Sequence, residues 1–308
     1  MKKNRKITLT KNKGSYGISF NAMASPCEVI IESTDKKLAQ QLANIVTAEV
    51  WRIEDKYSRY NPNSLCSTIN VNAGQSVSID EETYLLLNFA DHCYQLSDGL
   101  FDITSGALGA VWSFDGKSVG SNQFPSQSDI ESVLPYLGWD KIKFDHQQIT
   151  LAKGMEIDFG GIGKEYAVDR AIILAKQLSE KPILVNLGGD LAVTGPRNNS
   201  EPWQVAIERP DVDTEQDKTK SADMIISLKS GALATSGDAR RFLIKDGIRY
   251  GHILNTKTGW PIVKAPRSIT VVAPQCIQAG ILATLALLQG SKAEHFLTEQ
   301  DIIFWARR

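Results

Sequence analysis

The sequence predicts an α+β fold in which mixed sheets and helices form two lobes. Apolar runs with the alternation typical of strands occur in the N-terminal, middle and C-terminal parts of the chain. Longer amphipathic stretches lie between them, but strands and helices do not alternate regularly, which argues against a doubly wound parallel sheet. No internal repeat, low-complexity segment or linker interrupts the 308 residues. We therefore expect a single domain over residues 1–308.

The N-terminal part predicts two short strands and a helix. The strands fall within residues 15–33, on either side of a turn at Ala24–Pro26. Residues 36–57 predict a helix, because their apolar side chains recur at helical spacing. These side chains are Leu42, Val46, Val50, Ile53 and Tyr57. Residues 57–70 are polar and rich in turn formers, so no regular element is expected there.

A second helix is predicted from about Asp80 to Leu96. Asp80 suits the N-cap position because its carboxylate can accept a hydrogen bond from a backbone N–H of the first turn. The expected apolar stripe comprises Leu85, Phe89, Cys93 and Leu96. Exposed loops are expected near residues 115–128 and 210–222, where polar residues and turn formers concentrate.

The C-terminal half predicts several strands and one buried helix. Strands are expected within residues 182–195, where two meet at a glycine turn, and at 224–228, around 249–255 and at 268–273. A helix is expected from about residue 276 to residue 288, and it is apolar nearly all round, so it should be buried.

Charge and cysteine content argue against several classes of protein. The net charge of −1 provides no basic face for nucleic acid or for an anionic membrane. The four cysteines are scattered without CxxC spacing, which favours buried free thiols over disulfides or zinc. No apolar signal sequence, lipid-attachment cysteine or membrane-spanning stretch is found in the chain. We expect a cytoplasmic protein, or a periplasmic one if a leader was removed.

Five segments combine glycine with Asp, Ser, Thr or His. They are 97–106 (SDGLFDITSG), 158–170 (DFGGIGKEYAVDR), 186–195 (NLGGDLAVTG), 234–241 (ATSGDARR) and 251–261 (GHILNTKTGWP). Taken singly, each is more often a simple turn, because these residues form turns for local reasons. Segment 158–170 predicts a strand end, a glycine turn and a helix with Lys164 in its first turn. Such a turn either cradles phosphate or only reverses the chain, and it matches neither the Walker pattern nor GxGxxG.

Two further positions are candidates for function. His252 ends an apolar alternation directly before a polar turn, and catalytic and structural roles are equally compatible with that place. Gly280 and Thr284 lie four residues apart in the predicted buried helix and therefore on one face. Such a face either packs closely against another backbone or faces a ligand, and packing is the simpler interpretation.

In order and spacing, the five segments resemble the ApbE family, the FAD:protein FMN transferases. The resemblance extends from about Met23 to Gly290 and includes the stretches AMASPCEV, SRYNPNS and QAGILATLALLQG. It implies an ApbE-type, T-fold-like architecture that binds FAD between two lobes. It also implies Mg²⁺-dependent cleavage of the FAD pyrophosphate, transfer of FMN to a Thr or Ser hydroxyl of a target flavoprotein, and release of AMP.

The resemblance also assigns site residues. Those expected to contact the flavin nucleotide are Met23, Tyr60, Leu100, Phe101, Asp102, Asp158, Lys164 and Leu254. The backbone carbonyl of Gly161 and the hydroxyl of Thr284 are expected to hold Mg²⁺. His252 matches the active-site histidine of the family, and its usual pKa suits a base that takes the proton of the target hydroxyl.

Two positions depart from the family pattern. Gly280 stands where the family has a metal-binding Asp, and Glu165 stands where it usually has Gly. Neutral oxygens alone do not offset the dehydration of Mg²⁺, so loss of the Asp should weaken metal binding. Three interpretations follow. The chain is a transferase whose metal site is completed by Glu165 or by the target protein, an FAD-binding protein without transferase activity, or an FAD pyrophosphatase.

Overall fold

The computed structural model describes residues 5–114, 124–208, 222–238 and 241–308. Its largest sheet has eight strands in the order β1-β2-β3-β7-β8-β11-β14-β15, and all neighbouring pairs are antiparallel. The strands are β1 (Thr8–Asn12), β2 (Ser15–Ala22), β3 (Ser25–Ile31), β7 (Ile183–Leu187), β8 (Asp190–Val193), β11 (Gly231–Gly237), β14 (Ser268–Ala273) and β15 (Ile303–Arg307). Strands from both ends of the chain thus belong to one sheet.

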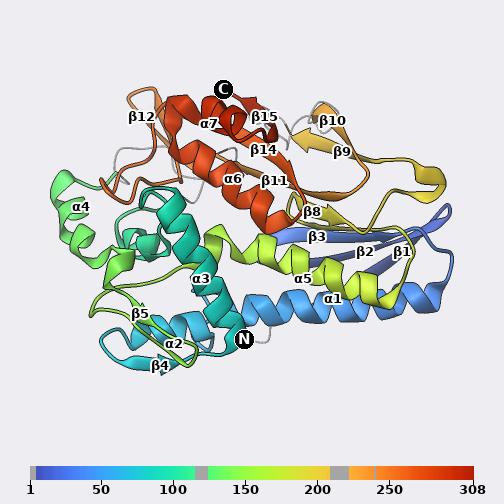
Figure 1. Cartoon of the computed structure of the whole chain (residues 1–308), viewed down its shortest axis with the longest axis horizontal. Coiled ribbons are helices and arrows are strands. Elements are labelled where there is room, and N and C mark those ends of the chain that lie inside the picture. Colours follow the sequence, from blue (N-terminus) through green and yellow to red (C-terminus); the bar gives the residue numbers. More distant parts are fainter. Residues whose placement is uncertain (1–4, 115–123, 209–221, 239–240) are drawn as a thin grey trace.

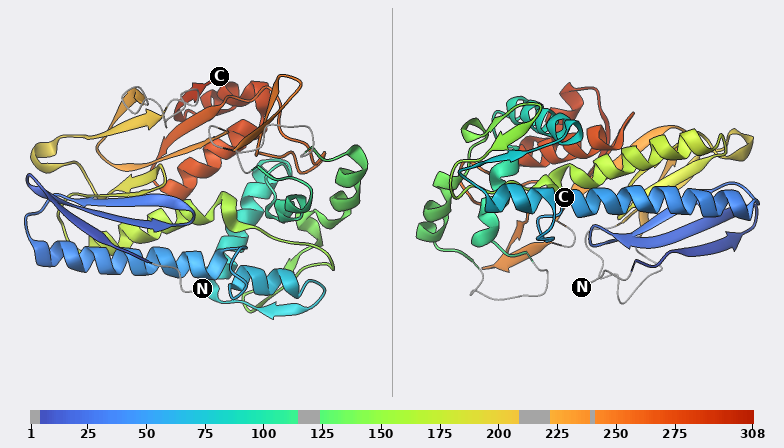
Figure 2. Two further views of the ribbon diagram at one scale, coloured as in Figure 1. Left: turned by 180° about the vertical axis from the view of Figure 1, so that it is seen from behind. Right: turned by 90° about the horizontal axis from the view of Figure 1, so that it is seen from below.

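Three helices cover one face of this sheet (Figures 1 and 2). They are α1 (Lys36–Tyr57), which packs on β2, α5 (Gly163–Leu178), which packs on β7 and β8, and α6 (Cys276–Leu288), which packs on β11 and β14. The alternation of a strand is clear in β7, where Val185 faces these helices and Leu184 faces the opposite side. Full burial of one such aliphatic side chain stabilises the fold by about 1.5–3 kcal/mol.

The opposite face of the sheet is covered by a second, two-stranded sheet. It consists of β9 (Trp203–Glu208) and β10 (Ala222–Leu228). Trp203 packs there against Leu184 and Leu191, and its indole N–H donates to the carbonyl of Gly195 at 2.9 Å. The large sheet is therefore buried on both faces in this region.

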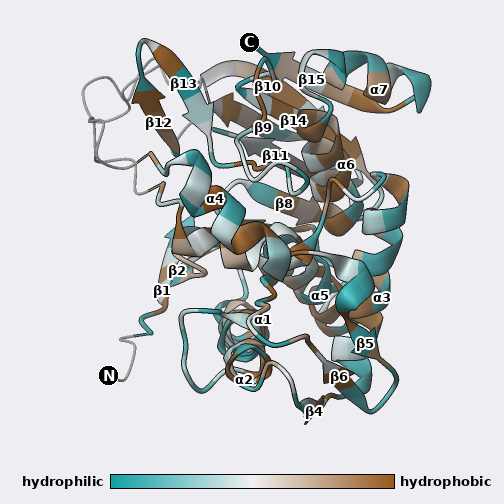
Figure 3. Ribbon diagram, turned by 90° about the vertical axis from the view of Figure 1, so that its left-hand side faces the viewer, coloured by the Kyte–Doolittle hydropathy of each residue, from teal (hydrophilic) through white to brown (hydrophobic). Residues whose placement is uncertain are grey.

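A more irregular part of the molecule lies beside the sheet (Figure 1). It contains α2 (Leu65–Val71), α3 (Glu81–Leu96), the 3-10 helix η1 (Ile103–Ala110), α4 (Gln127–Val133), and a sheet of β4 (Ser76–Ser78), β6 (Gln148–Thr150) and β5 (Lys143–Phe144). The hairpin of β12 (Phe242–Lys245) and β13 (Ile248–Gly251) joins it through Leu243, which packs with Leu108 and Ile130. Figure 3 shows hydrophilic residues on the outer sides of α3 and α4. The predicted α+β class is confirmed.

The predicted N-terminal helices are confirmed, but one buried face was predicted wrongly. α1 spans residues 36–57, and α3 begins after Asp80, whose carboxylate accepts a backbone N–H of its first turn. On α3, however, Leu85 is 59% exposed and Leu96 is 76% exposed, whereas Leu86 and Leu87 are buried. Three leucines in a row leave the pattern without a unique apolar face, so the neighbouring elements decide the rotation of the helix.

Two N-terminal boundaries also differ from the prediction. The turn between β2 and β3 falls at Met23–Ala24, where both residues have positive φ (49° and 57°), rather than at Ala24–Pro26. The polar segment 57–70 includes most of α2, which begins at Leu65 because the hydroxyl of Ser64 caps that helix.

The expected loops lie largely outside the described residues. This holds for residues 115–123 of the first loop and for 209–221, which include most of the second. Within the described part, α4 already begins at Gln127, because Ser126 and Asp129 form a capping box.

All four cysteines are buried and free, as the sequence predicts. Burial raises the pKa of Cys27 to about 11 and the pKa values of Cys66 and Cys93 to about 12, so these thiols are protonated at neutral pH. Among the described residues, none of the helices has the length and apolar character needed to cross a bilayer.

Candidate active site

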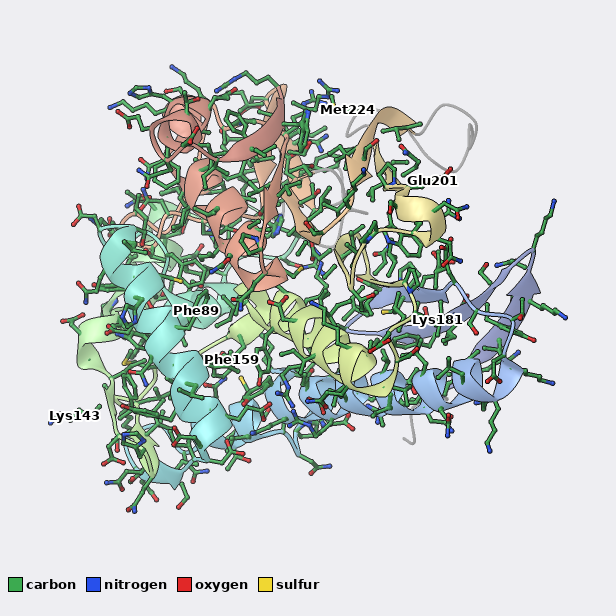
Figure 4. All side chains as sticks on the ribbon, turned by 45° about the vertical axis from the view of Figure 1, so that its right-hand side comes forward. Phe89, Lys143, Phe159, Lys181, Glu201 and Met224 are labelled. Atoms are coloured by element: carbon green, nitrogen blue, oxygen red, sulfur yellow. The ribbon has the colours of Figure 1, made fainter. Side chains whose placement is uncertain are left out.

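The glycine turn of segment 158–170 leads into the N-terminus of α5, which no side chain caps. The turn is a short 3-10 helix, η5 (Phe159–Gly161), and Asp158 begins it by accepting the N–H of Gly160 at 2.8 Å. Phe159 is buried and fixes the turn in the core beside α5 (Figure 4). The uncapped N–H groups of a helix start carry partial positive charge. This geometry favours phosphate binding over a simple reversal of the chain.

Lys164, in the first turn of α5, forms an ion pair with Asp190 at the start of β8, with 2.5 Å between Nζ and Oδ2. Asp190 is 2% exposed, and its Oδ1 accepts the N–H of Thr235 on β11 at 3.1 Å. Burial lowers the pKa of Lys164, but the charges of Asp190 and Glu165 outweigh this effect and raise the pKa above its usual value. Lys164 is therefore a fixed cation at which segments 158–170, 186–195 and 234–241 meet.

Glu165 of α5 lies directly against Gly280 of α6. A Cβ atom on Gly280 would be 2.6 Å from Cγ of Glu165, 2.9 Å from its Cδ and 2.8 Å from its Oε1. Glu165 is partly buried as a residue, but its Oε2 atom is enclosed and has no hydrogen-bond partner in the described part of the chain. Burial, and after it the negative charge of Asp190, raises the pKa of the Glu165 carboxyl well above its usual range.

Thr284 stands one turn after Gly280 on α6, and its hydroxyl donates to Oγ of Ser236 on β11 at 3.1 Å. α6 also packs against η5, the turn that ends at Gly161. The two residues that the family resemblance assigns to the metal therefore lie on elements in contact.

His252 directly follows β13, at the strand end that the sequence predicts. Its Nδ1 atom is enclosed and has no hydrogen-bond partner among the residues described, and the ring of Phe114 lies edge-on at 6.5 Å. Burial, with the positive charge of Arg241, lowers the pKa of His252 to about 4, below the range assumed from the sequence. The imidazole is therefore neutral at pH 7, as a base must be. A hollow of about 60 Å³ is lined by Gly251 and Ile253, the two neighbours of His252 in the sequence, and by Asp238 among others, but not by His252 itself.

Segments 97–106 and 251–261 are held together by Thr256, whose hydroxyl donates to the carbonyl of Gly99 at 2.9 Å and to that of Leu100 at 3.3 Å. Leu254 lies in the second segment and forms an isolated antiparallel β-bridge with Pro261, on the other side of the turn. The ring of Phe101 is 3.2 Å from the Cβ position of Gly161, so it packs on the glycine turn.

The carboxylate of Asp102 organises this region of the chain. One oxygen accepts the N–H of Thr104 at 2.8 Å, and the other accepts the N–H of Trp139 at 3.1 Å. Both oxygens are thus engaged within the protein. The role of the Asp102 side chain is therefore to hold the backbone at Thr104 and Trp139 in place.

Tyr60 is 87% exposed. Arg59 connects it to the glycine turn. The Arg59 guanidinium is 5.5 Å from the Tyr60 ring and pairs with Asp158 at 3.3 Å. The sequence analysis missed Arg59 and Asp190. Each had a signal: Asp190 begins an apolar strand, where a buried carboxylate needs a cation, and Arg59 stands inside the SRYNPNS stretch.

Met23 lies in the turn between β2 and β3, which overlies the glycine turn between β7 and β8. A Cβ atom on Gly188 would be 2.6 Å from Cβ of Ser25 and 4.0 Å from Cδ of Lys164. The turn that carries Met23 is thereby placed close to the Lys164 side chain.

A larger surface hollow, of about 560 Å³, lies against α1. It is lined by Arg5, Ala48, Trp51, Arg52, Asp55, Lys56, Asn63 and Leu65. None of these residues belongs to the five segments. The charged and unpartnered groups around Lys164, rather than this hollow, therefore define the candidate site.

Comparison with known proteins gives a consistent result. Residues 23–304 match the model of the ApbE family. The chain is 28% identical to the FAD:protein FMN transferase of Haemophilus influenzae, over 82% of this chain and 73% of that protein. It is 30% identical to the FAD:protein FMN transferase of Chlamydia pneumoniae, over 79% of this chain and 74% of that protein.

Solved structures agree with the fold. The ApbE protein of Thermotoga maritima superimposes with a TM-score of 0.82 at 30% identity, over 95% of this chain and 94% of that one. The apo form of the flavinyl transferase ApbE of Pseudomonas stutzeri gives a TM-score of 0.81 at 26% identity, over 99% and 92%.

Proposed function

Because the chain belongs to the ApbE family, we propose that it transfers FMN from FAD to a Thr or Ser hydroxyl of a target flavoprotein and releases AMP. The relatives compared above are named as FAD:protein FMN transferases. The observation that best supports the proposal is the ion pair of Lys164 with Asp190, at which three of the five segments meet. A fixed cation beside an uncapped helix start suits a pyrophosphate.

In the proposed reaction, the target hydroxyl oxygen bonds to the phosphorus of the FMN half. The bond from that phosphorus to the bridging oxygen breaks, and AMP leaves with this oxygen. Phosphoryl-type transfer depends mainly on in-line positioning and on neutralisation of charge. Lys164 and the first N–H groups of α5 would supply both to the phosphates.

His252 is the proposed base that takes the proton of the attacking hydroxyl. The neutral ring and the unpartnered Nδ1 atom support this role. The residues proposed to contact the flavin nucleotide are Met23, Tyr60, Leu100, Phe101, Asp102, Asp158, Lys164 and Leu254. Among them Asp102 would act through its backbone, because both of its carboxylate oxygens already accept hydrogen bonds.

The residues around Thr284 fit Mg²⁺, the metal that the family resemblance implies. The Thr284 hydroxyl and the Gly161 carbonyl are hard oxygen donors of the kind that Mg²⁺ prefers, and both are proposed to hold it. The enclosed Oε2 atom of Glu165, which has no partner in the described structure, is an unfilled acceptor in the same region. When bound, Mg²⁺ would neutralise charge on the two phosphates and on the departing AMP.

Mass spectrometry of an acceptor domain that carries the family's target Thr motif tests the proposal. After incubation with this protein, FAD and Mg²⁺, the intact acceptor should gain the mass of one FMN, and AMP should appear in equal amount. An acceptor whose target Thr is replaced by Val should remain unmodified. Free FMN and AMP without an adduct would instead identify a pyrophosphatase.

A second candidate function is FAD binding without transfer, and Gly280 is the observation that favours it. The family has a metal-binding Asp at this position, and this chain has no carboxylate on α6. In the same experiment, this alternative predicts that FAD stays intact and bound while the acceptor mass does not change.

A further inference from the structure

We infer that Glu165 supplies the carboxylate ligand of the metal site, from α5 rather than from α6. The inference rests on the proposed function, because Mg²⁺ is the metal expected to serve it. It concerns only the two positions at which this chain departs from the family pattern, Glu165 and Gly280.

The first argument is steric. All three distances from the Cβ position of Gly280 to the Glu165 side chain are below 3.0 Å, so a residue larger than Gly at 280 would displace that side chain. Glu165 therefore occupies the volume that a side chain at 280 would fill. The two departures are thus coupled: the carboxylate stays in one place, but it reaches that place from the opposite helix.

The second argument is electrostatic. Among the described residues, the charges that act on Glu165 are those of two carboxylates, Asp190 and Asp169, and of one cation, Lys164. Lys164 pairs with Asp190, which leaves Oε2 of Glu165 enclosed and without a hydrogen bond from the described residues. The ionised form of a carboxyl buried in that state is costly, and a divalent cation bound to it would offset that cost.

The third argument is the donor set. Gly280 and Thr284 are one turn apart on α6, so a carboxylate at the Cβ position of Gly280 lies on the same helix face as the Thr284 hydroxyl. The turn that ends at Gly161 packs on the same helix. A carboxylate, a hydroxyl and a backbone carbonyl are the hard donors that Mg²⁺ and Mn²⁺ take.

The test is a Mn²⁺ titration of the full-length protein, followed by electron paramagnetic resonance, with and without FAD. Glu165→Gln keeps the shape of the side chain but removes its charge, and Mn²⁺ affinity should fall by about 100-fold or more, since even residues behind a ligand contribute 10–100-fold. Glu180→Gln, a matched change at an exposed position two residues after the end of α5, should leave the affinity unchanged. The double variant Glu165→Gly with Gly280→Asp returns the carboxylate to α6, and it should recover most of the wild-type affinity.

The double variant also covers the case in which Glu165→Gln disturbs folding. Recovery in the double variant would support the inference even then, because only the origin of the carboxylate has changed. Wild-type affinity in a folded Glu165→Gln variant, or no Mn²⁺ affinity in the folded wild-type protein, would overturn it.

The acceptor assay separates this inference from the proposed function. Loss of Mn²⁺ affinity in Glu165→Gln without any FMN transfer by the wild-type protein would uphold the metal ligand and overturn the transferase. Transfer by the wild-type protein with undiminished Mn²⁺ affinity in Glu165→Gln would do the reverse.

Discussion

The ionisable side chains of Lys164, Glu165 and Asp190 lie together in the region where α5 begins. The Lys164–Asp190 pair joins α5 to β8, and Asp190 also accepts the N–H of Thr235 on β11. Removal of one partner from such a pair leaves the other charge poorly solvated, which costs more than the pair itself contributes. The chemistry of the site and the stability of the fold therefore depend on the same residues.

Replacement of Asp190 by Asn should destabilise the protein while preserving its shape. The amide can still accept the N–H of Thr235, but Lys164 loses its counter-charge. Because Lys164 is 29% exposed, water compensates part of the loss, and we expect a decrease of about 1–3 kcal/mol in the free energy of unfolding. Urea denaturation measures this, with Asp246→Asn in the exposed turn between β12 and β13 as control. Equal stability of the two variants would contradict the prediction.

His252 gives the site its expected pH dependence. Burial keeps its pKa at about 4 in the free protein, so the neutral base is retained at acidic pH. For the transfer reaction, kcat/KM should stay level from pH 7 down to about pH 5, instead of falling near the usual histidine pKa of about 6.5. His252→Asn should lower kcat by about 100-fold or more, whereas His295→Asn, an exposed histidine on α7 (Ala293–Glu299), should not. A decline of kcat/KM centred near pH 6.5 would argue against a buried neutral base.

At the scale of elements, α1, α3 and α5 are joined by one carboxylate. Glu82 of α3 accepts hydrogen bonds from Arg52 at 2.6 Å, from Lys56 at 2.6 Å and from Tyr166 at 2.8 Å. Burial by itself raises the pKa of Glu82, but these hydrogen bonds outweigh it and lower the pKa to about 2. The position of α3 therefore depends on charge as well as on its apolar face.

The Glu82 network predicts a pH-dependent loss of stability. The folded pKa lies below the unfolded value of about 4.3, so the contribution of Glu82 is fully present above that value and is lost as the pH falls toward 2. Allowing for partial exposure, Glu82→Gln should cost about 1 kcal/mol at pH 7 and almost nothing near pH 2. Denaturation at both pH values measures the difference, and Glu180→Gln should show none. A cost that is the same at both pH values would exclude the ionic contribution.

The buried face of α3 can be tested with neighbouring leucines. Leu87 is fully buried, so Leu87→Ala should lower the free energy of unfolding by about 2–5 kcal/mol. Leu85 is 59% exposed, and Leu85→Ala should change it by less than about 0.5 kcal/mol. Chemical denaturation of both variants decides the point. A larger loss of stability in Leu85→Ala than in Leu87→Ala would instead support the buried face that the sequence pattern predicts.

The sequence could predict elements whose cause is local. The apolar stripe of residues 36–57 determines α1, and Asp80 determines the start of α3. It could not predict the contact of Glu165 with Gly280, because that contact depends on how α5 and α6 pack and leaves no local pattern. The pairing of Lys164 with Asp190 likewise leaves no local pattern, although the two residues lie in segments 158–170 and 186–195.

At the scale of the whole molecule, the candidate site draws on residues from nearly the entire chain. Arg59, Lys164, Asp190, Thr284 and the strand end at His252 come from elements that share one sheet or pack beside it. Ordering of any one of these elements therefore contributes to the site. Ligand binding should in turn stabilise the molecule as a unit.

FAD should accordingly raise the thermal stability of the protein in a single transition. At about 100 times its Kd, a ligand that binds only the folded state adds about 2.7 kcal/mol to the free energy of unfolding, which shifts Tm by several degrees. Tyr60→Ala should not change Tm without FAD, because the ring is 87% exposed, but it should reduce the shift if the ring contacts the flavin nucleotide. Differential scanning calorimetry with and without FAD measures both effects. A bound ligand stabilises only the cooperative unit that holds it. Two separate transitions, of which FAD shifts only one, would therefore show that part of the chain unfolds independently of the site.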